Sequence, residues 1–207
     1  GGIPLNSLWR RLLFALKFGE YRILISGELN RDSRILFDRD INTRVRKIAP
    51  FFHYDGNPYV VVHDGRLFWI QDAYTVTDRY PYAAPHEGIN YIRNSVKVVV
   101  DAYHGSVNFY LIDSDDPLAA TYDRIFPDLF TPLEEMPAGL LEHLRYPVDL
   151  FEIQSDMVTL YHVTDANTFY AREDLWSMPL EPLEQYHGEE QQMEPYYTIL
   201  QLPGYEE

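Results

Sequence analysis

Residues 58–74 read PYVVVHDGRLFWIQDAY, and the predicted architecture is built around this segment. Asp64-Gly65 lies between two runs that are rich in β-branched and aromatic residues. An Asp-Gly pair in this position favours a tight β-hairpin turn, because both turn residues need a positive φ. The segment therefore predicts a hairpin near 59–74, with antiparallel strands at about 59–63 and 67–74.

The region downstream adds one strand and several helices. Residues 106–112 alternate apolar and polar side chains with the period of two that is typical of a strand. Asp116 before Pro117 predicts the start of a helix, because Asp caps helices and proline fits their first turn. Further helices are predicted at about 138–145, 147–158 and 166–176. The mixture predicts an α+β fold in which several helices surround an antiparallel sheet.

Three other segments carry competing signals. Residues 88–105, GINYIRNSVKVVVDAYHG, contain valines that favour a strand, but the apolar residues also recur at helical spacing, and we predict a helix. Residues 21–26, YRILIS, predict a strand, and a second helix is predicted from a cap at Ser33 to Pro50. Near the C-terminal end we predict an exposed acidic loop over 179–194, followed by a final strand.

The composition bounds the class of protein. With 207 residues, of which 46% are hydrophobic, the chain is long enough for one large domain with a continuous core. The net charge of −15 would repel a phosphate backbone, which excludes nucleic acid as a partner. The absence of cysteine excludes disulfides, thiolate metal sites and a cysteine nucleophile. No apolar run approaches the ~20 residues that cross a bilayer.

The charge is unevenly distributed, which divides the chain into two predicted parts. Residues 1–50 carry ten Lys and Arg against five Asp and Glu, a net charge of +5. Residues 51–207 carry seven against 27, a net charge of −20. We expect a basic, mainly helical leading segment (1–50) packed on an acidic α+β body (51–207). The chain starts without Met or a leader, and we expect it to be an internal piece of a longer protein, truncated at its C-terminal end.

The first helix is predicted from a cap at Asn6 or Ser7 to a stop at Gly19. Its apolar residues recur at helical spacing, and basic residues lie off that stripe. A basic amphipathic helix fits an anionic membrane surface, whereas the alternative is that the stripe packs on the domain itself. The candidate membrane-proximal residues are Arg10, Arg11 and Lys17.

Four segments carry a resemblance to a known family: GGIPLNSLWRRLLFALKFGE (1–20), DSRILFDRDINTRVRKIAPFF (32–52), GRLFWIQDAYTVTDRYPYA (65–83) and NYIRNSVKVVVDAYHGSVNFYLID (90–113). Over essentially its whole length the chain resembles an uncharacterised family of multi-pass bacterial integral membrane proteins of unknown function. The resemblance implies that several transmembrane helices precede a large soluble region, of which this chain is the first part. It implies a place at the cell membrane on the extracytoplasmic side, but no activity, substrate or catalytic residue.

The candidate metal site consists of Asp113, Asp115 and Asp116, at the junction between a predicted strand and a predicted helix. Hard cations prefer several oxygen ligands on a tight turn. The spacing departs from the twelve-residue calcium loop, because the glycine of its sixth position is absent and Pro117 takes its fifth position. The alternative is that Asp116 caps the helix and the other two carboxylates are solvated. We predict no cofactor, with calcium as the alternative.

The candidate binding face consists of aromatic residues that lie in and after the hairpin. They are Phe68, Trp69, Tyr74, Tyr80 and Tyr82. Exposed rings of this kind suit a glycan or a protein surface. The alternative is that they pack in the core and the rim of the sheet, since aromatic residues favour strands.

No motif predicts catalysis. The serine-hydrolase elbow, the P-loop and the dinucleotide fingerprint are absent from the sequence, and the seven histidines contain no zinc-binding pair four residues apart. Neighbouring acids such as Glu134-Glu135 point apart in a helix or strand, so they predict no glycosidase pair. We predict no catalytic residue.

These observations predict an extracytoplasmic module that binds or assembles without catalysis. The predicted partners are the protein's own transmembrane region, an envelope glycan, a protein subunit or a second copy of the chain. The alternative is a carboxylate- or metal-dependent hydrolase acting on a cell-envelope polymer. A hydrolase predicts carboxylates or histidines converging in a deep pocket, whereas a module predicts a broad, shallow aromatic patch.

Overall fold

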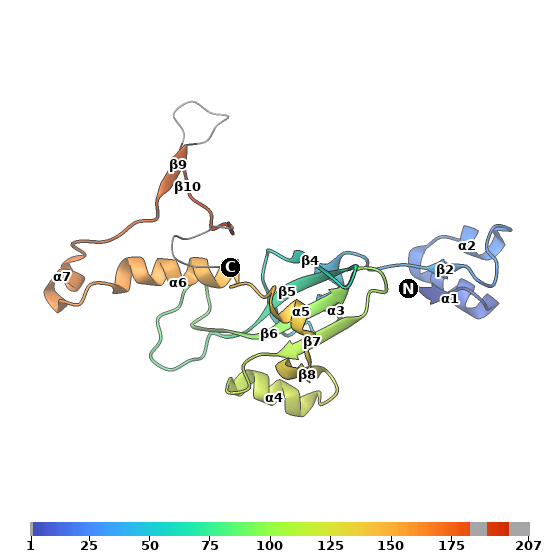
Figure 1. The fold of residues 1–207 in the computed structure, drawn as a ribbon, viewed down its shortest axis with the longest axis horizontal. Helices are drawn as coiled ribbons and strands as arrows, with labels where there is room; N and C mark the ends of the chain where they lie inside the picture. Colours follow the sequence, from blue (N-terminus) through green and yellow to red (C-terminus); the bar gives the residue numbers. More distant parts are fainter. Residues whose placement is uncertain (1, 183–189, 199–207) are drawn as a thin grey trace.

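The computed structural model describes residues 2–182 and 190–198, which form a mixed α+β fold (Figure 1). The helices of the described chain are α1 (Leu8–Phe18), α2 (Arg22–Ile25), α3 (Ile41–Ile48), α4 (Pro117–Ile125), α5 (Ala138–Leu141), α6 (Val148–Tyr161) and α7 (Ala166–Ala171), with one 3-10 turn at Leu133–Glu135. The strands are β1 (Ile3–Pro4), β2 (Arg34–Ile35), β3 (His53–Tyr54), β4 (Tyr59–His63), β5 (Arg66–Thr77), β6 (Tyr91–Asp101), β7 (Val107–Leu111), β8 (Phe130–Pro132), β9 (Leu180–Pro182) and β10 (Glu190–Gln192).

A six-stranded sheet organises the fold. Its order is β3-β5-β6-β7-β8, and β4 also pairs with β5. All pairings are antiparallel except that of β7 with β8. The β4–β5 hairpin turns at Asp64 (φ 49°) and Gly65 (φ 70°), which are the positive φ values expected from the sequence. The α+β class, the hairpin and the strand at 106–112 are confirmed.

The predicted helix over residues 88–105 is wrong, because most of this segment is the central strand β6. β6 pairs with β5 on one side and with β7 on the other. Both faces of the strand are buried, so its consecutive valines have no period of two, and a helical face fits the same residues equally well. The β-branched side chains were the correct signal.

A β-bulge interrupts the pairing of β5 with β6. Ala73 faces Val96, but Tyr74 faces Asn94, so Ser95 is one extra residue on β6. A bulge changes the direction of the side chains around it. The Ser95 hydroxyl thereby donates to Asp116 at the start of α4, at 2.6 Å.

The two faces of the sheet bury two separate cores. One is covered by α3 and α4, and its buried members are Val45, Ala49, Phe52, Tyr54, Ala73, Val96, Val98, Val100 and Phe109. The other is covered by α5, and its buried members are Val61, Ile70, Val99, Tyr110, Met136 and Leu140. Side chains alternate between these cores along β5 and β6, as strand geometry requires.

The N-terminal region agrees with the sequence at α1 and departs from it afterwards. Ser7 caps α1 and Gly19 ends it in the left-handed conformation, as expected. The predicted strand at 21–26 is wrong, since residues 22–25 form α2. The second helix starts later than predicted, because Asp40 and not Ser33 caps α3, and residues 34–35 pair with β1 instead. Segments as short as 22–25 and 34–35 have little structural preference of their own, so packing against the rest of the chain determines whether they form a helix or a strand.

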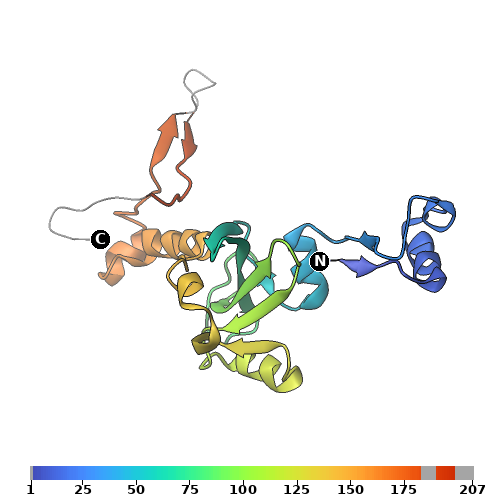
Figure 2. The same ribbon diagram turned by 45° about the vertical axis from the view of Figure 1, so that its right-hand side comes forward.

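Three parts follow one another along the molecule (Figures 1 and 2). We call residues 2–37 the N-terminal unit, residues 38–145 the sheet body, and residues 146–182 with 190–198 the C-terminal arm. In the arm, α6 and α7 match the predicted helices approximately, and part of the predicted acidic loop pairs as the hairpin β9–β10. Most of the predicted final strand lies outside the described residues.

Candidate functional site

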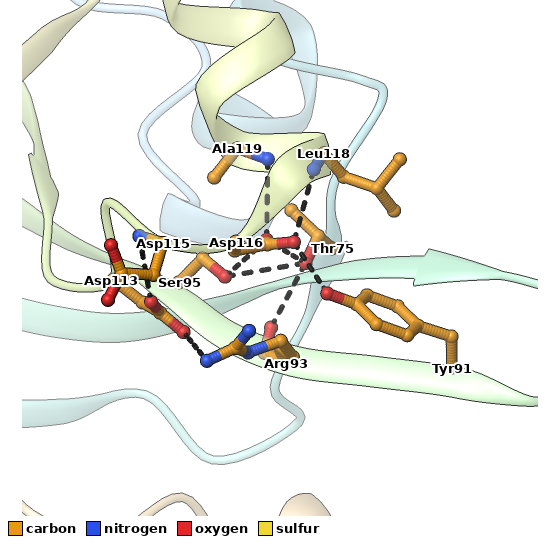
Figure 3. Close-up of polar contacts among 9 residues, drawn as sticks. All are labelled: Thr75, Tyr91, Arg93, Ser95, Asp113, Asp115, Asp116, Leu118 and Ala119. Atoms are coloured by element: carbon orange, nitrogen blue, oxygen red, sulfur yellow. Dashed lines mark hydrogen bonds and ion pairs between the residues drawn. The ribbon is translucent and has the colours of Figure 1, made fainter.

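The Asp116 carboxylate is a structural acceptor at the start of α4 (Figure 3). It is fully buried and caps the helix through the amides of Leu118 and Ala119. The hydroxyls of Thr75, Ser95 and Tyr91 also donate to it, at 2.5, 2.6 and 2.6 Å. Burial opposes ionisation, but these hydrogen bonds outweigh it and lower the pKa of Asp116. Asp116 thus joins β5, β6 and α4.

The other two acids of the candidate metal site lie apart from this acceptor. Asp113 pairs with Arg93 at 2.5 Å and accepts the amide of Asp115, whose side chain is exposed. Within residues 2–182 and 190–198, no three His, Asp or Glu side chains are placed to hold a metal ion. The helix-cap alternative for Asp116 is confirmed.

The candidate aromatic face is not gathered on one surface. Trp69 packs against one core and Phe68 against the other, so they lie on opposite faces of the sheet. Tyr74 is fully buried and donates to Asp55. Tyr80 and Tyr82 are exposed, and Tyr80 stacks on Tyr91 at a centroid distance of 5.5 Å.

Helix α1 exposes the apolar stripe that the sequence pattern identifies. Its buried side carries Phe14 and Ala15, and Phe14 packs on Phe37 at 5.5 Å. The opposite side carries the exposed stripe, which consists of Leu8, Trp9, Leu13 and Leu16, 72, 75, 63 and 72% exposed. Nothing in the described part of the chain covers these four side chains, and such a bare apolar surface commonly marks an interaction site.

The three basic residues of α1 have different roles. Arg11 holds the N-terminal unit together, because its guanidinium donates to the carbonyls of Leu5 and Leu29, both at 3.0 Å. Lys17 lies over the Phe37 ring at 4.2 Å, and Arg10 is exposed at the helix surface. With 3.6 residues per turn, Arg10 and Lys17 lie on the same side of α1, beside the exposed stripe and two turns apart, about 10 Å along the helix axis.

A second candidate site is built on a buried ion pair in the sheet. Asp72 and Lys97 are cross-strand partners on β5 and β6, and their side chains are 5% and 4% exposed. Asn94 donates to Asp72 Oδ1 at 2.7 Å, and the Lys97 ammonium also donates to the Arg145 carbonyl at 2.8 Å. Burial raises the pKa of Asp72, although the neighbouring ammonium opposes this shift.

Asp55 connects Asp72 to the start of α6, and its backbone amide donates to the Asp72 carbonyl at 3.0 Å. Its carboxylate accepts the amides of Asn57 at 2.8 Å and Asp149 at 3.1 Å, and the Tyr74 hydroxyl as well. Asp149 in turn accepts the amide of Gly56 at 2.9 Å. Burial and the nearby Asp55 carboxylate raise the pKa of Asp149.

A cleft of about 320 Å³ lies beside these groups, between the sheet body and the C-terminal arm. Its lining includes Asp55, Tyr59, Asp72, Arg145, Tyr146 and Tyr197. Two adjoining hollows of about 560 and 620 Å³ share lining residues with it and with each other along α6. We call the three together the α6 groove. Each of the three hollows has a volume in the range typical of small-molecule sites, ~300–1,000 Å³.

The sequence analysis did not identify the residues of this cleft. The available signal was the presence of Asp72 and Lys97 inside apolar strand patterns, because buried charged residues are paired. No pattern in the sequence around residues 145–149 or 195–197 indicates that these segments lie against the two strands.

Fold and surface together define a class of protein: a mixed α+β module with an exposed basic amphipathic helix and a polar, aromatic groove on an acidic body. In the part of the chain that the structure describes, no helix has both the length and the apolarity needed to span a membrane. The family model described as an uncharacterised protein family, UPF0182, matches residues 1–207. The chain belongs to this family.

Relatives described only as UPF0182 proteins come from distant bacteria. The chain is 55% identical over 206 residues to one from Moorella thermoacetica and 51% identical over 205 residues to one from Pelotomaculum thermopropionicum. Each alignment covers 99% of this chain but 22% of the relative, so the chain spans about a fifth of the length of these proteins. No solved structure matches the chain.

Proposed function

We propose that this chain is an extracytoplasmic module of a bacterial integral membrane protein, which binds or assembles without catalysis and lies against the membrane through α1. The observation that carries the proposal is the exposed stripe of α1 with Arg10 and Lys17 beside it. A helix of this kind inserts its apolar side among lipid headgroups, and its cations attract anionic lipids.

The surroundings of the stripe support the same orientation. The neighbouring helix α2 ends with Ile25 and is preceded by Tyr21, and these side chains are 71% and 64% exposed. Residues 2–37, the N-terminal unit, carry six Lys and Arg against three Asp and Glu, a net charge of +3, whereas residues 38–207 carry 11 against 29, a net charge of −18. An anionic surface therefore attracts the N-terminal unit and repels the acidic remainder of the chain, which orients the module with α1 toward the lipid.

Sedimentation with vesicles of phosphatidylcholine and phosphatidylglycerol tests the membrane contact. We expect the chain to bind, and the double variant Leu8→Ser/Leu16→Ser to bind at least about tenfold more weakly, because burying each leucine contributes ~1.5–3 kcal/mol. The variant Arg10→Gln/Lys17→Gln should lose binding to anionic vesicles, by ~1 kcal/mol per cation.

The matched control is Val60→Ser/Val62→Ser on β4, since these valines are also exposed but lie in the sheet body. The control should bind vesicles like the unchanged chain. Binding that is equally strong in the α1 variants and in the control would overturn the membrane contact.

A labelling experiment tests the side of the membrane. The chain contains no cysteine, so a single Ser114→Cys change places one thiol on an exposed loop. In living cells that contain the full-length protein, we expect a membrane-impermeant maleimide to label this variant more strongly than the same protein with Ser114 unchanged. Labelling that occurs only after lysis contradicts the extracytoplasmic location.

A carboxylate-dependent hydrolase of envelope polymers is the second candidate. It is favoured by the raised pKa values of Asp72 and Asp149 beside the cleft, since such shifts concentrate at functional sites. Release of reducing ends from an envelope polymer by the chain, and its loss in an Asp72→Asn variant that circular dichroism shows to be natively folded, would favour this candidate over a binding module.

A further inference from the structure

The cleft at the end of the α6 groove contains a buried acceptor with free capacity. Asp72 is 4% exposed and lines the cleft. Its Oδ1 receives Lys97 and Asn94, whereas no hydrogen bond within residues 2–182 and 190–198 reaches its Oδ2. Because Asp72 lines the cleft and an ionised carboxylate oxygen is an acceptor, this oxygen can accept a hydrogen bond from a ligand there.

Two donors lie in the same cleft. The Arg145 guanidinium makes no ion pair or hydrogen bond with the described residues, but it is held over the rings of Tyr59 and Tyr197, at 4.5 and 5.2 Å. The Tyr59 hydroxyl accepts the Arg145 amide at 3.1 Å, which leaves its own proton free to donate. The cleft therefore offers a planar donor group and a planar acceptor group to one ligand.

Aromatic rings line the groove beyond these polar groups. Tyr146, Tyr196 and Tyr197 are 49, 70 and 50% exposed, and they line the hollow next to the cleft. The Tyr197 hydroxyl donates to the Tyr146 carbonyl, which ties this wall to the start of α6. From Val148 to Asp156 the groove follows α6 for about 12 Å at 1.5 Å per residue, which exceeds one ring-sized ligand.

The charges around the groove disfavour anionic ligands. Glu152 and Glu194 line the far hollow, and burial together with neighbouring carboxylates raises the pKa of Glu152. The Asp72 charge, in contrast, is already compensated by Lys97. Vicinal hydroxyls allow one ligand to hydrogen-bond to both the carboxylate and the guanidinium. A flat apolar face allows the same ligand to stack on the tyrosines. Neither contact requires the ligand to carry a net charge.

We propose that the α6 groove binds an uncharged oligosaccharide, with one sugar ring in the cleft between Asp72 and Arg145 and the following rings on Tyr146 and Tyr196. This inference deepens the proposed function and rests on its binding role, because it names the ligand class. It does not depend on the contact of α1 with lipid.

The test is a titration of the intact chain, without vesicles, with cellohexaose, laminarihexaose and chitohexaose. Calorimetry gives the affinity, and NMR identifies the residues that shift. We expect at least one hexasaccharide to bind, with shifts at Arg145 and Tyr196. Arg145→Gln and Tyr196→Ala should each weaken binding about tenfold or more, since each removes a charged hydrogen bond or a stacking face.

Matched controls separate this loss from a general effect on the chain. Arg79→Gln removes an exposed arginine and Tyr82→Ala an exposed tyrosine, both outside the groove, and both should bind like the unchanged chain. Asp72→Asn leaves the buried Lys97 ammonium without its counter-charge, so this variant is used only if circular dichroism shows native folding. The test therefore depends on the Arg145 and Tyr196 variants.

Three results overturn the inference: none of the hexasaccharides binds, binding persists unchanged in Arg145→Gln and Tyr196→Ala, or a lysine-rich peptide shifts the groove residues and the saccharides do not. The vesicle experiment is independent of this titration. If the chain binds vesicles but no hexasaccharide, the oligosaccharide inference is rejected and the membrane contact stands. If it binds a hexasaccharide but no vesicles, the membrane contact is rejected and the oligosaccharide inference stands.

Discussion

Asp116 is the residue at which local sequence and distant contacts agree most closely. The Asp-Pro pair predicts a helix cap, and the structure adds three hydroxyl donors from two strands. The lowered pKa of Asp116 means that its ionised form stabilises the fold at pH values above the unfolded value of 3.8. This contribution disappears as the pH falls through the lower folded value.

Replacing Asp116 by Asn should therefore change stability in a pH-dependent way. At pH 7 we expect the variant to lose about 1.5–3 kcal/mol of unfolding free energy, the value of hydrogen bonds to a charged acceptor. The loss should shrink below pH 3.8, where the unchanged chain also becomes protonated. Urea unfolding at several pH values measures this, with the exposed Asp115→Asn as control. A loss independent of pH would contradict the role of the charge.

The Asp72–Lys97 pair gives a second prediction for single residues. Lys97→Met leaves a buried carboxylate without its cation and should cost about 3–5 kcal/mol of unfolding free energy. The double variant Asp72→Leu/Lys97→Met should recover most of this loss, because no uncompensated charge remains. Thermal and urea unfolding measure both. If the single variant loses less than about 1 kcal/mol, water reaches the carboxylate and the pair is not buried as described.

Among the elements, the β4–β5 hairpin depends on its turn. Gly65 has φ +70°, a conformation that costs a side-chain-bearing residue about 1–2 kcal/mol. Gly65→Ala should therefore lower the unfolding free energy by about 1 kcal/mol. Gly27→Ala is the matched control, since Gly27 has no positive φ and open space around it. Equal stability of the two variants would mean that the turn has relaxed.

Element type was predictable wherever the signal was local. Ser7 and Gly19 mark the ends of α1, and Asp64-Gly65 marks the hairpin. β6 was mispredicted because its apolar residues face two cores, and a strand buried on both sides has no characteristic period. Helix α2 was mispredicted for another reason, because its four residues are too few to show a helical pattern.

For the whole molecule, the separation into three parts predicts unequal stability. Amide exchange should be slowest in β5 and β6, which pair with each other and contribute to both cores. In α1 and α2 we expect exchange at least about tenfold faster, because the N-terminal unit can open without exposing either core. Hydrogen exchange read by mass spectrometry measures this. Protection of α1 equal to that of β6 would mean that the unit and the sheet body open together.

The surface of the molecule also follows from this arrangement. The composition predicts an acidic body and a basic leading segment, and the pattern of α1 predicts an apolar stripe. The stripe is exposed only because Phe14, Ala15 and Phe37 already fill the small core of the N-terminal unit from the other side of the helix. A stripe in the sequence cannot reveal which of two apolar sides a helix buries.

Turns, caps, the α+β class and the charge asymmetry were readable in the sequence, because each depends on residues within a few positions of one another or on composition. The pairing of Asp72 with Lys97, the hydroxyl cluster around Asp116 and the cleft with Arg145 were not readable in this way. They join residues 21 to 94 positions apart, and they exist only where strands, bulge and α6 meet. Such contacts depend on the packing of the complete chain, and no local pattern encodes them.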